Sequence, residues 1–401
     1  MTAETLTDEP VAYPFGRTDM LQPAGEFATI RAERPITKVR LPTGDEAWLV
    51  TRYADAREVL TDDRFARGFA DPDAVGGGFG GFLGELAVFA DPAVHARFRR
   101  VAGKALLVSA EQLREPVRRI TDELLAGMAA RGPVADLVDA VHFPVSIRTI
   151  CELIGVPEAD QHRFRGWAGA FLSVSRFEPN ELAQRLREMN AYVRELLAAR
   201  AAEPGEDFVS TLVTTRDVDG RTMGFDEQMA TVYAVLVSGY ETVAHALGKG
   251  LLALFGHPEQ LAALRAAPDL AAAAVDEILR YAPPDGGFGM PLHPTEEVTV
   301  GGTRLTPGDT VLVGVWSANR DERCFAGADE FDVDRRPNPH LSFGVGPRYC
   351  TGAPLARLQM ETVLRGLVER FPGLRLAVAP EEVPRHDGFI VEGPRELLVT
   401  W

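Results

Sequence analysis

The sequence predicts a mostly α-helical fold that also contains small β-sheets. Long stretches repeat apolar residues at three- and four-residue spacing, as amphipathic helices do. Short runs rich in β-branched residues occur near both ends of the chain. No internal repeat and no low-complexity linker divides the 401 residues. We therefore expect a single domain over residues 1–401.

The first elements expected are two strands, and helices then dominate the chain. The strands are Ile36–Arg40 and Ala47–Thr51, joined by a turn at Pro42–Asp45. Apolar periodicity, with cap and stop signals between segments, predicts helices at Tyr53–Leu60, Pro92–Leu107, Ala110–Ala130, Leu137–Ile154, Ala159–Phe171 and Glu181–Ala202. The glycine-rich segment Asp71–Asp91 is expected to be a loop.

The longest helical pattern runs from about Phe225 to Phe255 and is apolar on several sides, so we expect it to be buried. At this length it would span roughly 45 Å, enough to cross a domain. The remaining expected elements are helices at Pro258–Ala266, Pro268–Tyr281 and Ala353–Phe371, strands at Val298–Val300, Thr303–Leu305 and Thr310–Val315, and a strand-like tail at Leu374–Trp401.

The composition is that of an acidic globular protein. Hydrophobic residues make up 46% and charged residues 25%, and the net charge of −16 disfavours nucleic acid or an anionic membrane as a partner. The 3 cysteines are too few and too scattered for a disulfide framework or a zinc site. Neither a signal peptide nor a membrane-spanning run is found. We expect a cytoplasmic protein.

Residues 340–352, HLSFGVGPRYCTG, hold the most informative pattern. Gly344, Gly346 and Pro347 impose a tight turn, and Cys350 follows just before a predicted helix. The N-terminus of a helix favours negative charge and so favours a thiolate, the form that binds a soft metal such as iron. For a lone cysteine, a buried structural thiol is the alternative.

The middle of the long helix carries Ser238-Gly239-Tyr240-Glu241-Thr242. A carboxylate and a hydroxyl in an apolar helix are costly unless they have a function, and Gly239 leaves space beside the backbone. The alternative is that Thr242 bonds back to a carbonyl one turn earlier and merely bends the helix.

Two further pairs share a helix face, Glu277 with Arg280 and His95 with Arg99. Taken alone, the first is well explained as an ion pair and the second as a surface pair.

Together these patterns resemble the cytochrome P450 family, whose haem-binding loop reads F-G-x-G-x-R-x-C-x-G, as residues 343–352 do. The acidic-alcohol motif of the long helix also matches, with Ser238 in place of the family's alanine. The likeness covers the chain from Ile36 to the C-terminal strands. It implies a single P450 catalytic domain with haem between the long, I-type helix and the cysteine loop with its L-type helix.

The resemblance implies that Cys350 is the iron ligand of a haem, expected to be haem b (iron protoporphyrin IX). Phe343 would shield the sulfur, and Gly344 belongs to the same loop. The haem propionates would be held by cationic side chains, which match His95, Arg99 and Arg348.

One departure concerns an arginine that the family usually has after Tyr281. Met290 or Leu292 stands where it would fall, and we expect His293 to substitute for it.

The other motifs receive roles by the same resemblance. Glu241 would relay protons from solvent and Thr242 would stabilise the bound oxygen, with Gly239 beside the haem and Ser238 adding a hydroxyl. A buried charge network serving fold integrity would comprise Glu277, Arg280 and Arg335. The substrate pocket, which the resemblance places among mostly apolar side chains, would be lined by Phe82, Phe89, Phe171, Val235, Phe288, Met290, Leu292, Phe389 and Ile390. Half of these positions are equally well explained as ordinary core.

The activity implied is that of a monooxygenase that uses O2 to hydroxylate a medium-sized hydrophobic or heteroaromatic small molecule in secondary metabolism. Epoxidation, oxidative C–C or C–N coupling, peroxide-driven chemistry and a non-catalytic haem-bound carrier or sensor are the alternatives. We expect a monomer that receives electrons from a separate ferredoxin and ferredoxin reductase. A basic docking patch for them is hypothesised at Arg97, Arg100, Lys104 and Arg357.

Overall fold

The computed structural model describes residues 9–17, 19–68, 92–171, 178–285, 291–386 and 391–401. Within these ranges the chain is mostly helical with small sheets, which confirms the predicted fold class. Its contacts divide it into two compact units, each built from separate stretches of the chain. Unit 1 takes residues 1–76, 287–330 and 340–349, and unit 2 takes the rest. A single catalytic domain over residues 1–401 stays a prediction.

Unit 1 is built on a mixed sheet with the strand order β1-β2-β3-β9-β6-β4. These strands are β1 (Val11–Ala12), β2 (Ile36–Arg40), β3 (Glu46–Val50), β4 (Phe65–Arg67), β6 (Pro291–Pro294) and β9 (Val311–Val313). A separate hairpin pairs β7 (Val298–Val300) with β8 (Thr303–Leu305). The helices of this unit are α1 (Glu26–Glu33), α2 (Tyr53–Thr61), α13 (Val315–Ala318) and the short 3₁₀ turn η6 (Gly346–Arg348).

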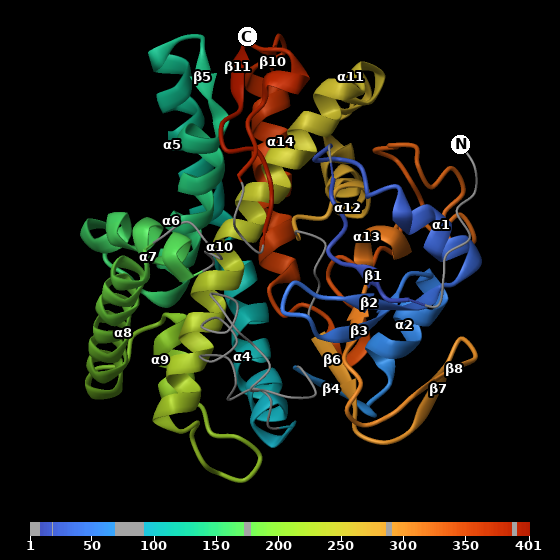
Figure 1. Cartoon of the computed structure of the whole chain (residues 1–401). Coiled ribbons are helices and arrows are strands. Elements are labelled where there is room, and N and C mark those ends of the chain that lie inside the picture. Colours follow the sequence, from blue (N-terminus) through green and yellow to red (C-terminus); the bar gives the residue numbers. More distant parts are fainter. Residues whose placement is uncertain (1–8, 18, 69–91, 172–177, 286–290, 387–390) are drawn as a thin grey trace. The chain divides into compact units, whose positions relative to one another are not determined.

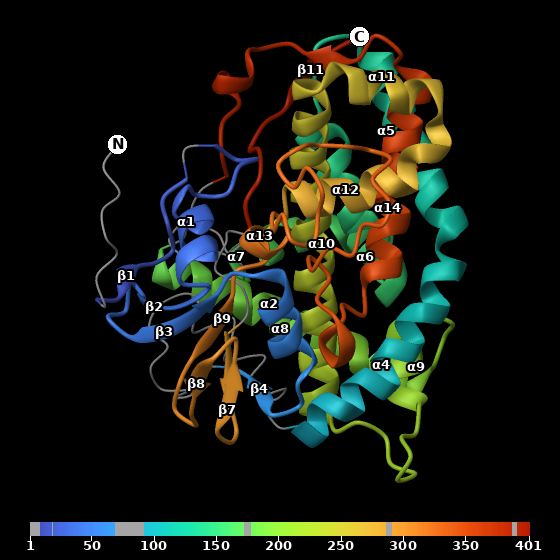
Figure 2. The same ribbon diagram turned by 90° about the vertical axis from the view of Figure 1, so that its right-hand side faces the viewer.

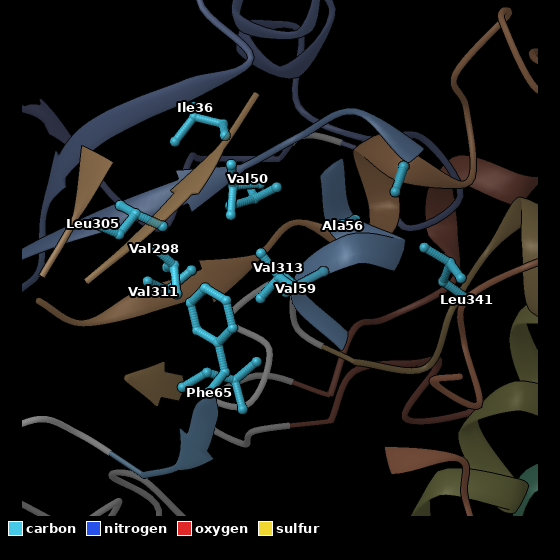
Figure 3. Packing of buried hydrophobic residues seen from close by; sticks show 13 residues of the cluster. Ile36, Val50, Ala56, Val59, Phe65, Val298, Leu305, Val311, Val313 and Leu341 are labelled. Atoms are coloured by element: carbon cyan, nitrogen blue, oxygen red, sulfur yellow. The ribbon is translucent and has the colours of Figure 1, made fainter. Parts of the chain in front are cut away.

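The core of unit 1 lies where α2 meets the strands (Figure 3). Val59 of α2, Phe65 of β4 and Val311 of β9 are each at most 1% exposed. Burying side chains of this size stabilises the fold by about 1.5–3 kcal/mol each. This packing holds the end of α2 and the start of β4 in place beneath η6.

Unit 2 contains most of the helices and a small sheet in which β11 (Leu398–Thr400) pairs with β10 (Arg375–Leu376) and β5 (Ala135–Asp136) (Figure 1). Its helices are α4 (Pro92–Gln112), α5 (Arg114–Arg131), the π-helix η3 (Val138–His142), α6 (Phe143–Ile154), η4 (Glu158–Asp160), α7 (Gln161–Phe171), α8 (Pro179–Ala202), α9 (Phe208–Thr214), α10 (Phe225–Gly256), α11 (Pro258–Ala266), η5 (Pro268–Leu270), α12 (Ala271–Tyr281), α14 (Ala353–Arg370) and η7 (Pro380–Glu382).

Helix α10 is the predicted long buried helix and is 32 residues long. Its first turn is closed by the Glu227 carboxylate, which accepts a hydrogen bond from the Gly224 amide at 2.8 Å. It packs against α6, α12 and α14 within unit 2 (Figures 1 and 2). Among the described residues, no helix is both long and apolar enough to cross a membrane.

Several predicted boundaries were wrong. The predicted break after Leu107 is absent because α4 continues to Gln112, and the predicted helix Leu137–Ile154 begins as the π-helix η3. Pro144 lies in the first turn of α6, where its missing N–H is tolerated. The short helices α1, α9 and α13 were not predicted. The predicted loop Asp71–Asp91 lies outside the described residues.

Candidate functional site

Cys350 lies just ahead of α14 with its thiol exposed. Its carbonyl oxygen accepts a hydrogen bond from the Ala353 amide at 3.3 Å. A Cβ atom on Gly352 would lie 3.9 Å from the sulfur, so the backbone that leads into the helix passes close to the thiol. The predicted position at the N-terminus of a helix is confirmed, and the helix dipole there favours a thiolate.

The predicted tight turn precedes Cys350 and belongs to unit 1. Gly344 has a φ of 66° and Gly346 a φ of 61°, a region that side chains strongly disfavour. A Cβ atom on Gly344 would also lie 2.7 Å from the carbonyl oxygen of Arg348. Only glycine fits this position, so the turn is fixed by the sequence.

The middle of α10 is accessible on one side, although the helix is buried over most of its length. Ser238 is exposed and Thr242 partly exposed, whereas Glu241 is only 2% exposed. The Thr242 hydroxyl donates to the Ser238 carbonyl oxygen at 2.5 Å, and the Ser238 hydroxyl donates to the Ala234 carbonyl oxygen. Hydrogen bonding of Thr242 to a carbonyl oxygen one turn earlier is the alternative stated from the sequence. It leaves both hydroxyl oxygens able to accept a hydrogen bond.

Gly239 faces α6. A Cβ atom there would lie 2.5 Å from the Cδ1 atom of Ile150, so close packing of the two helices is sufficient reason for the glycine. Its expected contact with a cofactor stays a prediction.

Helix α4 carries His95 and Arg99 on one face, both partly exposed. The same helix reaches the residue that follows the cysteine, because a Cβ atom on Gly103 would lie 3.5 Å from Thr351 Cγ2. Helices α4, α10 and α14 thus pack on one another within unit 2. An exposed thiol at a helix N-terminus, accessible hydroxyls in a buried helix and cationic side chains suited to carboxylates fit a haem-thiolate group.

The predicted buried charge network is present. Arg280 donates to both oxygens of the Glu277 carboxylate at 2.8 Å, and neither side chain is exposed. The Arg335 Nε atom lies 3.2 Å from both oxygens of the same carboxylate. Sequence reasoning missed two other donors to Glu277, the Asp332 amide at 2.9 Å and the Asn338 side chain at 3.1 Å.

Arg348 forms hydrogen bonds within unit 1, and its expected contact with a haem propionate stays a prediction. Its guanidinium donates to the carbonyl oxygens of Leu60 at 2.8 Å, Asp62 at 3.2 Å and Phe65, which lie at the end of α2 and the start of β4. Burial lowers the pKa of this guanidinium. Within unit 1, the side chain therefore ties the turn to the end of α2 and the start of β4, a role the motif did not predict.

The other expected cofactor residues of unit 1 have local partners as well. The His293 ring lies in β6 with Nδ1 3.2 Å from the Gly68 carbonyl oxygen, and the Phe343 ring packs 5.8 Å from the His340 ring. Their roles toward a haem, like that of Gly344, remain predictions.

Of the predicted pocket residues, the structure describes the side chains of Val235 and Leu292. Val235 is 6% exposed on α10, and Leu292, at 2% exposed, belongs to the hydrophobic core of unit 1. Leu292 thus fits the core alternative better than a place in a substrate pocket. The side chain of Phe171 and the whole of Phe82, Phe89, Phe288, Met290, Phe389 and Ile390 lie outside the described residues.

The hypothesised basic docking patch is largely neutralised. Arg97 binds the Glu227 carboxylate at 2.8 Å, and Arg100 binds Asp217 at 2.6 Å. Arg357 likewise pairs with Asp276 at 2.8 Å. Exposed Lys104 keeps its place in the hypothesis, but the three arginines do not form the expected excess of positive charge.

Comparisons with known proteins agree with this site. The family model of cytochrome P450 matches residues 178–391. The chain is 39% identical over 402 residues to mycinamicin IV hydroxylase/epoxidase of Micromonospora griseorubida, covering 98% of this chain and 99% of that protein. It is 37% identical over 390 residues to the cytochrome P450 monooxygenase PikC of Streptomyces venezuelae, covering 96% and 92%.

A similar solved structure is the LnmA cytochrome P450 hydroxylase from the leinamycin biosynthetic pathway of Streptomyces atroolivaceus. It superposes with a TM-score of 0.88 at 35% identity, over 98% of this chain and 100% of that one. The chain therefore belongs to the cytochrome P450 family, and it is a haem-thiolate monooxygenase.

Proposed function

We propose that this protein holds haem b through Cys350 and hydroxylates a medium-sized hydrophobic or heteroaromatic secondary metabolite with O2. The observation that carries the proposal is the composition of unit 2, in which a thiol at the N-terminus of α14 accompanies an acid and an alcohol on α10. The relatives support the substrate class, since two of them are named for steps on mycinamicin IV and in the leinamycin pathway.

The haem, when bound, supplies the binding and activation of dioxygen, aided by electron donation from a thiolate ligand. The chain supplies the protons. The Thr242 hydroxyl donates a hydrogen bond to the Ser238 carbonyl oxygen. Its oxygen can therefore hold a water molecule by accepting a hydrogen bond from that water. Glu241, buried next to it in the chain, is placed to release a proton into such water and to be reprotonated.

Epoxidation is the second candidate, because the relative from Micromonospora is named as both hydroxylase and epoxidase. Oxidative coupling would use the same residues. A non-catalytic carrier or sensor and a peroxide-driven enzyme are disfavoured, since neither needs a buried acid beside an alcohol in α10.

Electrons are proposed to come from a ferredoxin and its reductase, acting on a monomer. Since Arg97, Arg100 and Arg357 are paired with carboxylates, the docking surface is not proposed at these residues.

The test of this function is oxygen incorporation under ¹⁸O2. With NADH, a ferredoxin and its reductase, we expect a medium-sized hydrophobic or heteroaromatic substrate to gain a single ¹⁸O atom, as read by mass spectrometry. Product that carries oxygen from labelled water instead, or NADH consumption that no member of a broad substrate panel stimulates, would contradict the proposal.

A further inference from the structure

Three histidines of unit 2 gather beside α10 and have no part in the mechanism above. His142 comes from η3, His245 from α10 and His386 from the segment after η7. The rings of His245 and His386 lie 4.9 Å apart between centroids. His142 reaches α10 one turn further along, since a Cβ atom on Gly248 would lie 3.6 Å from its Nδ1 atom.

His245 of this cluster lies on the same face of α10 as Glu241, the acid of the proposed site. Glu241, His245 and Lys249 follow one another at four-residue spacing, and each is at most 2% exposed. Lys249 closes this stripe by donating to the Pro283 carbonyl oxygen at 2.7 Å. His245 is therefore the titratable side chain that stands next to Glu241 on its own face of α10.

Buried polar atoms without protein partners line this stripe. Within the part of the chain that the structure describes, both ring nitrogens of His142 and the Nε2 atom of His245 have no hydrogen-bond partner. Protein interiors satisfy such groups with ordered water. His142 on η3 and His245 on α10 therefore point to water between these two elements.

Among the described residues no group of three or more His, Cys, Asp or Glu side chains could hold a metal ion, which favours water as the partner of these ring nitrogens. Besides Glu241 one turn earlier on α10, the ionisable neighbours of His245 are His142, His386 and Lys249. An Arg385–Glu392 pair at 3.8 Å flanks His386. Burial lowers the pKa of His142 to about 3. Burial is also the main cause that lowers the pKa of His245 well below its usual range, and the charges of neighbouring basic side chains lower it further. Both rings are thus neutral near pH 7 and each offers a donor and an acceptor.

We propose that His386 and His245, with ordered water between α10 and η3, form a proton route from solvent to Glu241. His386 is the partly exposed member and meets solvent. The neutral His245 ring takes up a proton at one nitrogen and releases one from the other, which leaves it in its other tautomer, and water passes the released proton to the carboxylate. The ring returns to its first tautomer before the next proton passes. This inference rests on the proposed function, because Glu241 needs resupply only if it delivers protons.

The experiment compares holoenzymes carrying His245→Leu, His386→Gln and Glu241→Gln. His257→Gln serves as the control, since this histidine ends α10 away from the cluster and bonds the Ala253 carbonyl oxygen at 2.8 Å. His245→Leu is expected to slow product formation about tenfold, to raise the solvent isotope effect and to divert NADH into peroxide. His386→Gln should give a smaller loss that grows as the pH rises, because a weakly basic amide cannot take up protons.

A readout independent of turnover is a high-resolution crystal structure of the holoenzyme. Ordered water between His245 Nε2 and the Glu241 carboxylate is expected, and His245→Leu should displace it. If Glu241→Gln is impaired while His245→Leu matches the wild type and no such water is seen, the route is wrong and the proposed function stands. If Glu241→Gln forms product at the wild-type rate, the proposed function fails along with the route.

Discussion

Replacing Glu241 with glutamine is expected to slow product formation by about 10²–10³-fold without loss of haem. Glutamine has nearly the same shape and keeps hydrogen-bonding capacity, but it cannot release a proton. Glu241 is 2% exposed, so bulk water cannot easily replace its carboxyl group. The rate of product formation, measured beside oxygen uptake and peroxide release, checks this result.

A matched control for this change is Asp226→Asn, which alters an exposed carboxylate in the first turn of the same helix. That variant should keep the wild-type rate. Thr242→Ala should release more peroxide, whereas Thr242→Ser, which keeps the hydroxyl, should stay near the wild type. A Glu241→Gln enzyme as fast as Asp226→Asn would remove the acid from the mechanism.

Replacing Glu277 with glutamine is expected to destabilise unit 2 by about 3–5 kcal/mol. The carboxylate accepts hydrogen bonds from Arg280, which is fully buried, and from Arg335, which is 9% exposed. Without its charge, two guanidinium groups remain buried with no counter-ion from this residue. Urea denaturation followed by circular dichroism measures the change in the free energy of unfolding.

The adjacent residue offers a matched control. Asp276 forms an ion pair with Arg357 in which both side chains are about one third exposed, at 32% and 33%. Pairs of this kind contribute at most about 1 kcal/mol, so Asp276→Asn should have a small effect. An equal decrease in the free energy of unfolding for the two variants would show that the Glu277 network stabilises the fold no more than an exposed ion pair does.

The long periodic helices could be predicted because their signals are local. The helix at Pro258–Ala266 has the predicted limits, and α10 ends one residue past its prediction. Helix α9 was missed because it has only 7 residues, although the Asp207 carboxylate accepts from the Ser210 amide at 2.7 Å as a cap. The break expected after Leu107 was wrong because no proline or glycine enforces it before Leu113.

The motif positions of the site could also be predicted, but the partners of their side chains could not. The turn before Cys350 could be predicted from its glycines, and the Glu277–Arg280 pair from its three-residue spacing on a helix. Neither prediction required knowledge of the tertiary fold. The assignment of Arg348 to a propionate stays a prediction, whereas its hydrogen bonds to three carbonyl oxygens depend on tertiary packing that no motif predicts. The contact of Asn338 with Glu277 joins segments far apart in sequence, so no local pattern predicts it.

Among the three cysteines, the structure favours Cys350 as the iron ligand. Burial raises the pKa of Cys151 to about 12, and burial followed by the charge of Asp321 raises that of Cys324. Both are therefore poor sources of thiolate, whereas Cys350 is exposed at a helix N-terminus.

The most direct test of thiolate ligation by Cys350 is the difference spectrum of the reduced protein with and without carbon monoxide. Wild type and Cys324→Ser should both show the long-wavelength Soret band from which the family takes its name. Cys350→Ser should lose that band. A band that persists in Cys350→Ser, or a wild-type spectrum typical of histidine ligation, would contradict the assignment of Cys350 as the iron ligand.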